Sequence, residues 1–178
     1  KDGRAERAGT AERDAEAAIL GGLDRQFVRF DKTLRRAARS LDEPDLPLSG
    51  REALTHRVRK QAKALRRSVH SLPEDSRVRS APLREACDRL HDVLGEIQDS
   101  VTARQWIRRI ARRAEAAGES SFGFGVLFEH ERAFCERAVA GFPADAAAVT
   151  AGYRQLADSR RRRRGKKHRT KRRKKSRG

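Results

Sequence analysis

Residues 54–67 read LTHRVRKQAKALRR, and this stretch decides the fold class of the 178-residue chain. Apolar residues recur every three or four positions, at Leu54, Val58, Ala62 and Leu65, which is the spacing of one side of an α-helix. Cationic residues occupy the opposite side: His56, Arg59, Lys60, Lys63, Arg66 and Arg67. The stretch therefore predicts an amphipathic helix whose apolar side packs into a core.

The cationic side of this helix is uninterrupted, because no acidic residue occurs between Ala53 and Leu72. A solvated polar face is the ordinary explanation for a charged helix side. Such a face usually mixes Glu with Lys, since opposite charges four residues apart stabilise a helix by about 0.2–0.5 kcal/mol and like charges cost a similar amount. A uniformly positive side instead favours a bound polyanion, which neutralises the charges and releases its own counterions.

The same spacing of apolar residues predicts further helices on both sides of this one. A helix up to Leu41 is followed by a break at residues 43–47, and Ser49 with Glu52 forms a capping-box pattern at the start of the next helix. The remaining helices are predicted to start near Pro82 and end at Gly118, to span 122–140, and to start again after Pro143 and end near Asp158. No segment has the pattern of a strand, so we predict an all-α, antiparallel four-helix bundle.

Charge divides the chain into a bundle and a tail. The net charge is +18, of which residues 51–70 carry +6 and residues 159–178 carry +14. The final segment has no periodic apolar residues, so the predicted organisation is a disordered N-terminus (1–9), a helical bundle (10–158) and a disordered Arg/Lys-rich tail (159–178).

Composition excludes several classes of protein. No apolar run approaches the roughly 18 residues that a membrane span needs. The two cysteines, Cys87 and Cys135, are too few for a disulfide scaffold or a zinc cage, and we expect an intracellular protein with reduced thiols. Because the chain begins at Lys1 and contains no methionine, we expect a processed product or a fragment.

Two motifs together resemble a known family. Residues 54–67 resemble the signature helix of CHAD domains (conserved histidine α-helical domains), with His56, Arg59, Lys63, Leu65 and Arg66 in the expected order. Residues 90–104, LHDVLGEIQDSVTAR, resemble the family's second motif, and residues 123–128 resemble a weaker third block. The family is usually built from two similar helical bundles, and this chain resembles only the second. Either the chain is a fragment, or two copies pair as a homodimer to rebuild the groove between the bundles.

The resemblance implies non-enzymatic binding of inorganic polyphosphate on a basic surface, without a cofactor, in the cytoplasm at polyphosphate granules. The motifs assign His56, Arg59, Lys63, Arg66 and Arg104 to that surface. Helical geometry adds Lys60, Arg67, Arg108 and Arg112, the last two as a second wall facing the cationic helix. The alternative is sequence-independent binding of DNA or RNA driven by the tail, since Arg160–Arg164 and Lys171–Lys175 attract any polyanion.

Other chemistry has weaker support in the sequence. The histidines lack the paired spacing of a metal site, and no Gly-rich phosphate loop, nucleophile elbow or carboxylate pair suggests an enzyme. We expect Glu96 or Asp99 to pair with a nearby arginine and order the groove. Only Trp106 and Tyr153 are large polar aromatics, which disfavours a surface on which bases stack.

Overall fold

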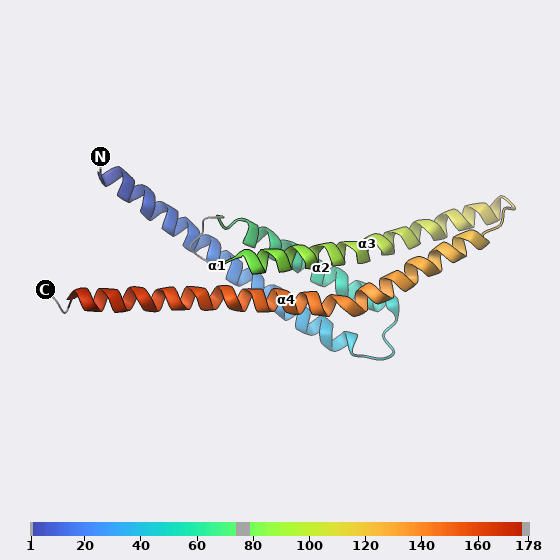
Figure 1. The fold of residues 1–178 in the computed structure, drawn as a ribbon. Coiled ribbons are helices and arrows are strands. Elements are labelled where there is room, and N and C mark those ends of the chain that lie inside the picture. Colours follow the sequence, from blue (N-terminus) through green and yellow to red (C-terminus); the bar gives the residue numbers. More distant parts are fainter. Residues whose placement is uncertain (1, 74–78, 176–178) are drawn as a thin grey trace.

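The computed structural model describes residues 2–73 and 79–175, with side chains described at residue 11 and within 14–73 and 79–163. Every regular element in these residues is a helix: α1 (Asp2–Leu41), α2 (Leu48–His70), α3 (Ala81–Ala116) and α4 (Phe122–Lys175) (Figure 1). The prediction of an all-α fold is confirmed. The side chains of residues 164–178, on which part of the predicted tail chemistry depends, lie outside this description.

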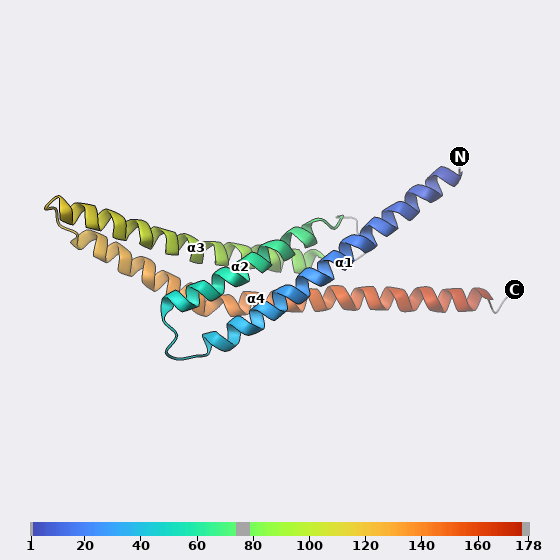
Figure 2. The same ribbon diagram turned by 180° about the vertical axis from the view of Figure 1, so that it is seen from behind.

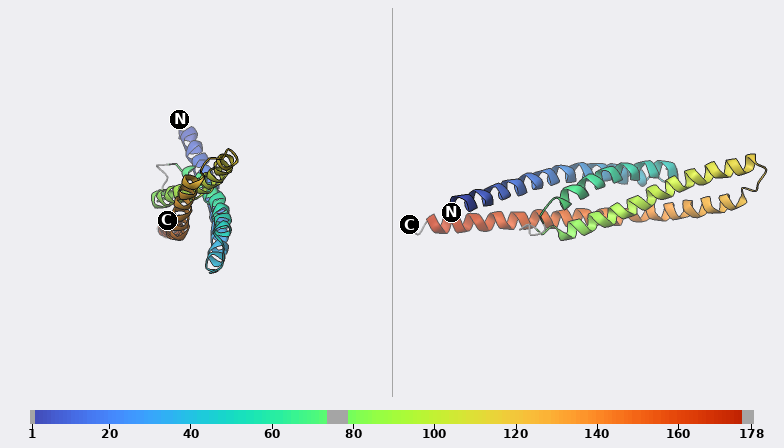
Figure 3. Two further views of the ribbon diagram at one scale, coloured as in Figure 1. Left: turned by 90° about the vertical axis from the view of Figure 1, so that its right-hand side faces the viewer. Right: turned by 90° about the horizontal axis from the view of Figure 1, so that it is seen from above.

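The helices pack in chain order, each antiparallel to the one before it. α3 and α4 form a long hairpin, α2 packs on α3, and α1 packs mainly on α2. The tip of the α3–α4 hairpin extends past the loop that joins α1 to α2 (Figures 1 and 2). The molecule is therefore an elongated bundle, as the end-on and top views show (Figure 3).

The core consists of the apolar stripes that the sequence predicts. On α2 the residues Val58, Ala62, Leu65 and Val69 are at most 3% exposed, so the predicted buried side of this helix is confirmed. Complete burial of an aliphatic side chain contributes about 1.5–3 kcal/mol, so these stripes hold α2 between its neighbours. Cys87 is buried among them, as expected.

Backbone geometry sets the ends of the helices. α2 starts at Leu48 directly after Pro47 and has no side-chain cap, so the predicted capping box of Ser49 and Glu52 does not form. Directly after the C-terminal end of α3, Gly118 adopts a φ of 75°, a left-handed conformation that glycine reaches without steric cost. The prediction that α3 stops at Gly118 is confirmed.

One proline and one glycine shape α4, and the proline behaves differently from expectation. Pro143 does not start a new helix but lies inside α4, which is bent along its length (Figure 1). A proline inside a helix removes one backbone hydrogen bond and commonly produces such a bend. Gly152 has the opposite role: a Cβ there would lie 2.9 Å from the Cα of Leu83, so the absence of a side chain lets α4 approach α3 closely.

The ends of the chain are more helical than predicted. α1 is helical from Asp2, and α4 continues to Lys175 and extends beyond the other helices (Figure 1). The described tail side chains of Arg161, Arg162 and Arg163 are exposed. A single helix with like charges on successive turns gains little from packing in water, which is the physical basis for expecting disorder in this segment.

α1 and α4 meet at one small contact. The rings of Phe27 and Tyr153 stack with centroids 3.6 Å apart, and the Tyr153 hydroxyl donates to Asp24 Oδ1 at 2.8 Å. Arg160 of α4 donates to the same carboxylate at 2.7 Å. Burial, then the hydrogen bond to Asp24, raises the pKa of Tyr153 to about 12. Tyr153 is thus a structural aromatic and is not available for stacking with a ligand.

Candidate anion-binding site

The cationic side of α2 faces α3 along a line of paired side chains. His56 Nδ1 donates to Gln98 Oε1 at 2.7 Å. Nearly three turns further along α2, Arg66 Nε donates to Asp88 Oδ1 at 2.5 Å, and His70 Nε2 donates to the same oxygen at 2.9 Å. These contacts fix the antiparallel register of the two helices. We refer to the surface between them as the seam, defined by His56, Arg59, Lys63 and Arg66 of α2 and Asp88, His91, Gly95 and Gln98 of α3.

The middle of the seam has cations without carboxylate partners. Arg59 Nε and His91 Nδ1 are buried and have no hydrogen-bond partner among the described residues. The exposed Lys63 forms no ion pair with a described residue. His56 of α2 lies level with Gln98 of α3, and the two helices are antiparallel. Arg59, three residues after His56, therefore lies level with Gly95, three residues before Gln98. A Cβ at Gly95 would meet nothing within 4 Å, so α3 leaves open space beside Arg59.

His91 reports the positive potential of the seam. Its pKa is lowered from the ordinary 6.5, first by burial and then by the charges of Arg66 and Arg59, with Lys63 acting in the same direction and Asp92 opposing it. Burial and the neighbouring cations both disfavour protonation of the imidazole. A bound anion would offset the contribution of the cations.

Asp88 is the carboxylate that enters the seam. Its pKa is lowered by its hydrogen bonds from Arg66 and His70 and by their charges, which outweigh the opposing effect of burial. The expectation that Glu96 or Asp99 would pair with an arginine here is wrong: Asp88 does so. Asp88 neutralises one of the three permanent cations, Arg59, Lys63 and Arg66, and the seam stays positive.

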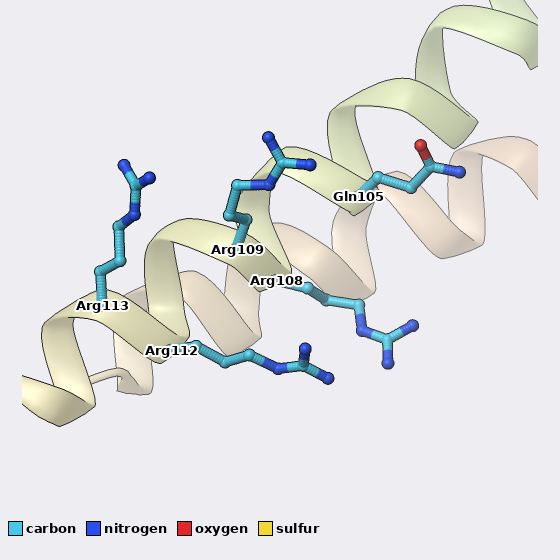
Figure 4. Close-up of a pocket in the computed structure, with 5 residues that line it drawn as sticks. All are labelled: Gln105, Arg108, Arg109, Arg112 and Arg113. Carbon is cyan, nitrogen blue, oxygen red and sulfur yellow. The ribbon is translucent and has the colours of Figure 1, made fainter.

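The structure places the other predicted ligands elsewhere. Lys60 is exposed and lines a cavity on the α1 side of α2, and Arg67 is also exposed. Arg108 and Arg112 lie near the tip of the α3–α4 hairpin with Arg109 and Arg113 (Figure 4). From the level of Gly95, Arg108 is thirteen positions along α3, or about 20 Å at 1.5 Å per residue. The sequence predicted that Arg108 and Arg112 form a second wall facing the cationic side of α2. They lie too far along α3 to do so.

Arg104 is buried beneath the surface. Its Nη2 donates to Glu52 Oε1, and the two side chains are 11% and 13% exposed. The guanidinium also lies 5.9 Å from the ring centroid of Phe128, and the Cys135 thiol donates to Glu52 Oε1 at 3.6 Å. Burial and the neighbouring Glu52 charge raise the pKa of Cys135 to about 11. This cluster ties α2 to the α3–α4 hairpin, whereas the resemblance had implied a ligand role for Arg104.

Sequence reasoning missed His91 as a member of the seam, although a signal was present. Asp88, His91, Gly95 and Gln98 are separated by three, four and three residues, as are His56, Arg59, Lys63 and Arg66. Matching spacings on two consecutive antiparallel helices predict that two such lines can face each other.

Comparison with known proteins identifies the family of the chain. The family model of the CHAD domain matches residues 3–108, which include nearly all of α1, all of α2 and the residues of the seam. The chain belongs to the CHAD domain family.

Curated relatives cover less of the chain. Over 87 residues, or 49% of this CHAD protein, it is 32% identical to an uncharacterized protein of Mycobacterium tuberculosis strain CDC 1551. It has the same identity to an uncharacterized protein of strain H37Rv. The match spans only 16% of each relative's length. No solved structure matches the chain. None of the described helices has a stretch long and apolar enough to cross a bilayer.

Proposed function

We propose that this CHAD protein binds inorganic polyphosphate along the seam and does so without catalysis. The observation that carries the proposal is the pair of buried, unpartnered nitrogens, Arg59 Nε and His91 Nδ1, beside the open space at Gly95. The Arg59 Nε–H is a donor, and a buried donor without a partner costs about 1–3 kcal/mol, which a bound phosphate oxygen would offset. His91 Nδ1 can donate in the same way when it carries the proton.

A linear polyanion suits the seam better than a single small anion. Arg59, Lys63 and Arg66 follow one another at intervals of four and three residues, which spaces them by about 5–6 Å along α2. A chain of phosphates can contact successive cations, and each contact releases a counterion. Proteins of this kind would gather wherever polyphosphate accumulates, so we propose a cytoplasmic location at polyphosphate granules.

The test is a titration of long-chain polyphosphate into the full chain, monitored by calorimetry at fixed salt. The seam variant is Arg59→Glu with Lys63→Glu. The matched control is Arg137→Glu with Arg154→Glu, which makes the same change in net charge at exposed positions of α4. We expect the seam variant to lose at least about tenfold more affinity than the control and to show a shallower dependence on salt. Equal losses in both variants would refute the seam as the site.

A second candidate function is sequence-independent binding of DNA or RNA through the tail. It is favoured by the 14 basic and no acidic residues of 159–178 and by the exposure of Arg161, Arg162 and Arg163. Competition between duplex DNA and polyphosphate for the full chain separates the candidates. If the tail binds nucleic acid, replacing these three arginines by glutamine weakens DNA binding. If the seam binds polyphosphate, the same replacement leaves polyphosphate binding largely intact.

Association of two copies is a further prediction of the family resemblance. Apolar side chains near the tip of the α3–α4 hairpin are exposed in the single chain: Trp106, Ile110, Phe122, Val126 and Leu127. Light scattering on the purified chain measures whether two copies associate.

Incubation with polyphosphate and assay of released phosphate tests the proposal that the protein is a binder and not an enzyme.

A further inference from the structure

A cationic cavity lies on the side of α2 away from the seam, between α2 and α1. It has a volume of about 280 Å³. Its rim carries the cationic side chains of Arg36, Arg57 and Lys60, and the rest of its lining is polar or aliphatic: Thr33, Ala37, Leu54 and Gln61. The neighbouring hairpin loop is held by Arg51, which donates to the carbonyl oxygens of Leu46 and Glu43 at 3.0 and 3.3 Å.

No described carboxylate neutralises the cations of this cavity. No acidic side chain lines the cavity, and Arg36, Arg57 and Lys60 form no ion pair with a described residue. Elsewhere on the same helix, Arg35 pairs with Asp31 at 2.8 Å, so the fold does pair surface arginines of α1 where a partner is available. Three like charges around one cavity repel one another unless an anion lies among them.

The cavity and the seam are close to each other across α2. Arg59 belongs to the seam and Lys60, the next residue, belongs to the cavity. Successive residues of a helix are rotated by about 100°, so these two side chains leave α2 toward α3 and toward α1 respectively. A helix with its side chains is about 10–12 Å across, which is a short distance for an extended polymer.

We propose that the cavity between α1 and α2 is a second phosphate subsite, and that a long polyphosphate chain crosses α2 at Lys60 to occupy the seam and the cavity together. This inference rests on the proposed function of the seam and adds a chain-length dependence to it. A short oligophosphate fits one subsite at a time. A long chain bound at the seam presents its free segment to the cavity at a high effective concentration, which can raise affinity by about 10²–10⁴ without a new kind of contact.

The experiment compares tripolyphosphate with long-chain polyphosphate on three full-length variants. The cavity variant is Arg36→Gln with Arg57→Gln. The control is Arg137→Gln with Arg154→Gln. The seam variant of this experiment carries glutamines, Arg59→Gln with Lys63→Gln, in place of the glutamates described above. The substituted arginines of the cavity and the control are exposed, and thermal melting verifies that each variant is folded.

We expect the cavity variant to lose at least about tenfold in affinity for the long chain relative to the control, and to bind tripolyphosphate as the control does. The seam variant should lose affinity for both ligands. Equal long-chain affinity in the cavity and control variants would overturn the second subsite while leaving the seam intact. Unchanged binding of both ligands by the seam variant would instead overturn the proposed function, whatever the cavity variant shows. Loss of tripolyphosphate binding in the cavity variant would also contradict the inference, because it would make the cavity the primary site.

Discussion

Replacing Arg104 by methionine should destabilise the protein without removing its polyphosphate site. Arg104 and Glu52 are only 11% and 13% exposed, so Arg104→Met leaves a carboxylate in the interior. Among the described residues, the one other side chain bonded to Glu52 is Cys135, whose thiol is a weak donor at 3.6 Å. Removing one partner of a buried ion pair costs about 3–5 kcal/mol, and the residual exposure of this pair places the loss near the lower value.

A loss of about 3 kcal/mol is readily measured in a chain of this size. Each kcal/mol shifts the melting temperature of such a protein by about 2–4 °C, so Arg104→Met should melt about 6–12 °C below wild type. The control is the double variant Glu52→Gln with Arg104→Met, which carries no uncompensated charge and should recover most of the loss. Circular dichroism gives the melting curves, and calorimetry gives polyphosphate affinity below the transition. Unchanged melting together with weakened polyphosphate binding would show that Arg104 is a ligand, as the family resemblance implied.

Other substitutions test the close contacts of the fold and the charge of the seam. Gly152→Ala places a Cβ against the backbone of Leu83, so we expect a loss of about 1–3 kcal/mol in a denaturant titration, whereas Gly141→Ala, which meets nothing within 4 Å, should be neutral or stabilising. Arg51→Met removes the donors that hold the α1–α2 loop, and faster amide exchange of that loop is the expected result. The pKa of His91 is lowered in the free protein, and a bound polyanion raises it, so wild type should bind polyphosphate more tightly as the pH falls through the pKa of the bound form. His91→Gln should flatten that dependence, and an unchanged pH profile would place His91 outside the site.

Much of the fold follows from local sequence patterns. The apolar stripe of α2 and the stop at Gly118 depend on helical periodicity and on the conformational freedom of glycine, which act within a few residues. Pro143 is the exception. A proline usually ends a helix, but α4 continues through it because packing against α3 on both sides of the bend outweighs one lost hydrogen bond.

The candidate site was only partly predictable for a related reason. The cationic side of α2 is visible in one helical turn after another, so Arg59 and Lys63 could be found from spacing alone. The role of Arg104 depends on Glu52, which is fifty-two residues away and is equally compatible with a local capping box. Likewise, the position of Arg108 along the bundle, relative to α2, depends on how far α2 and α3 each extend beyond the seam. Contacts set by long-range register are absent from any short window of sequence.

The distribution of carboxylates around α2 explains why charge is the decisive property of this helix. Asp88 of α3 bonds Arg66, the last arginine of the cationic line of α2. Glu52 of α2 bonds Arg104 of α3, which is buried and does not belong to that line. No described carboxylate forms an ion pair with Arg59 or Lys63 in the middle of this line, although the charge of Asp92 acts on the neighbouring His91. An acidic residue at an exposed position such as Lys63 would relieve the repulsion among the cations of α2 at little cost to packing. Pairs of opposite charge three or four residues apart stabilise a helix by about 0.2–0.5 kcal/mol. A fold that neutralises one end of a charged line and leaves its middle without ion pairs has the form expected of a surface whose missing anion comes from outside the chain.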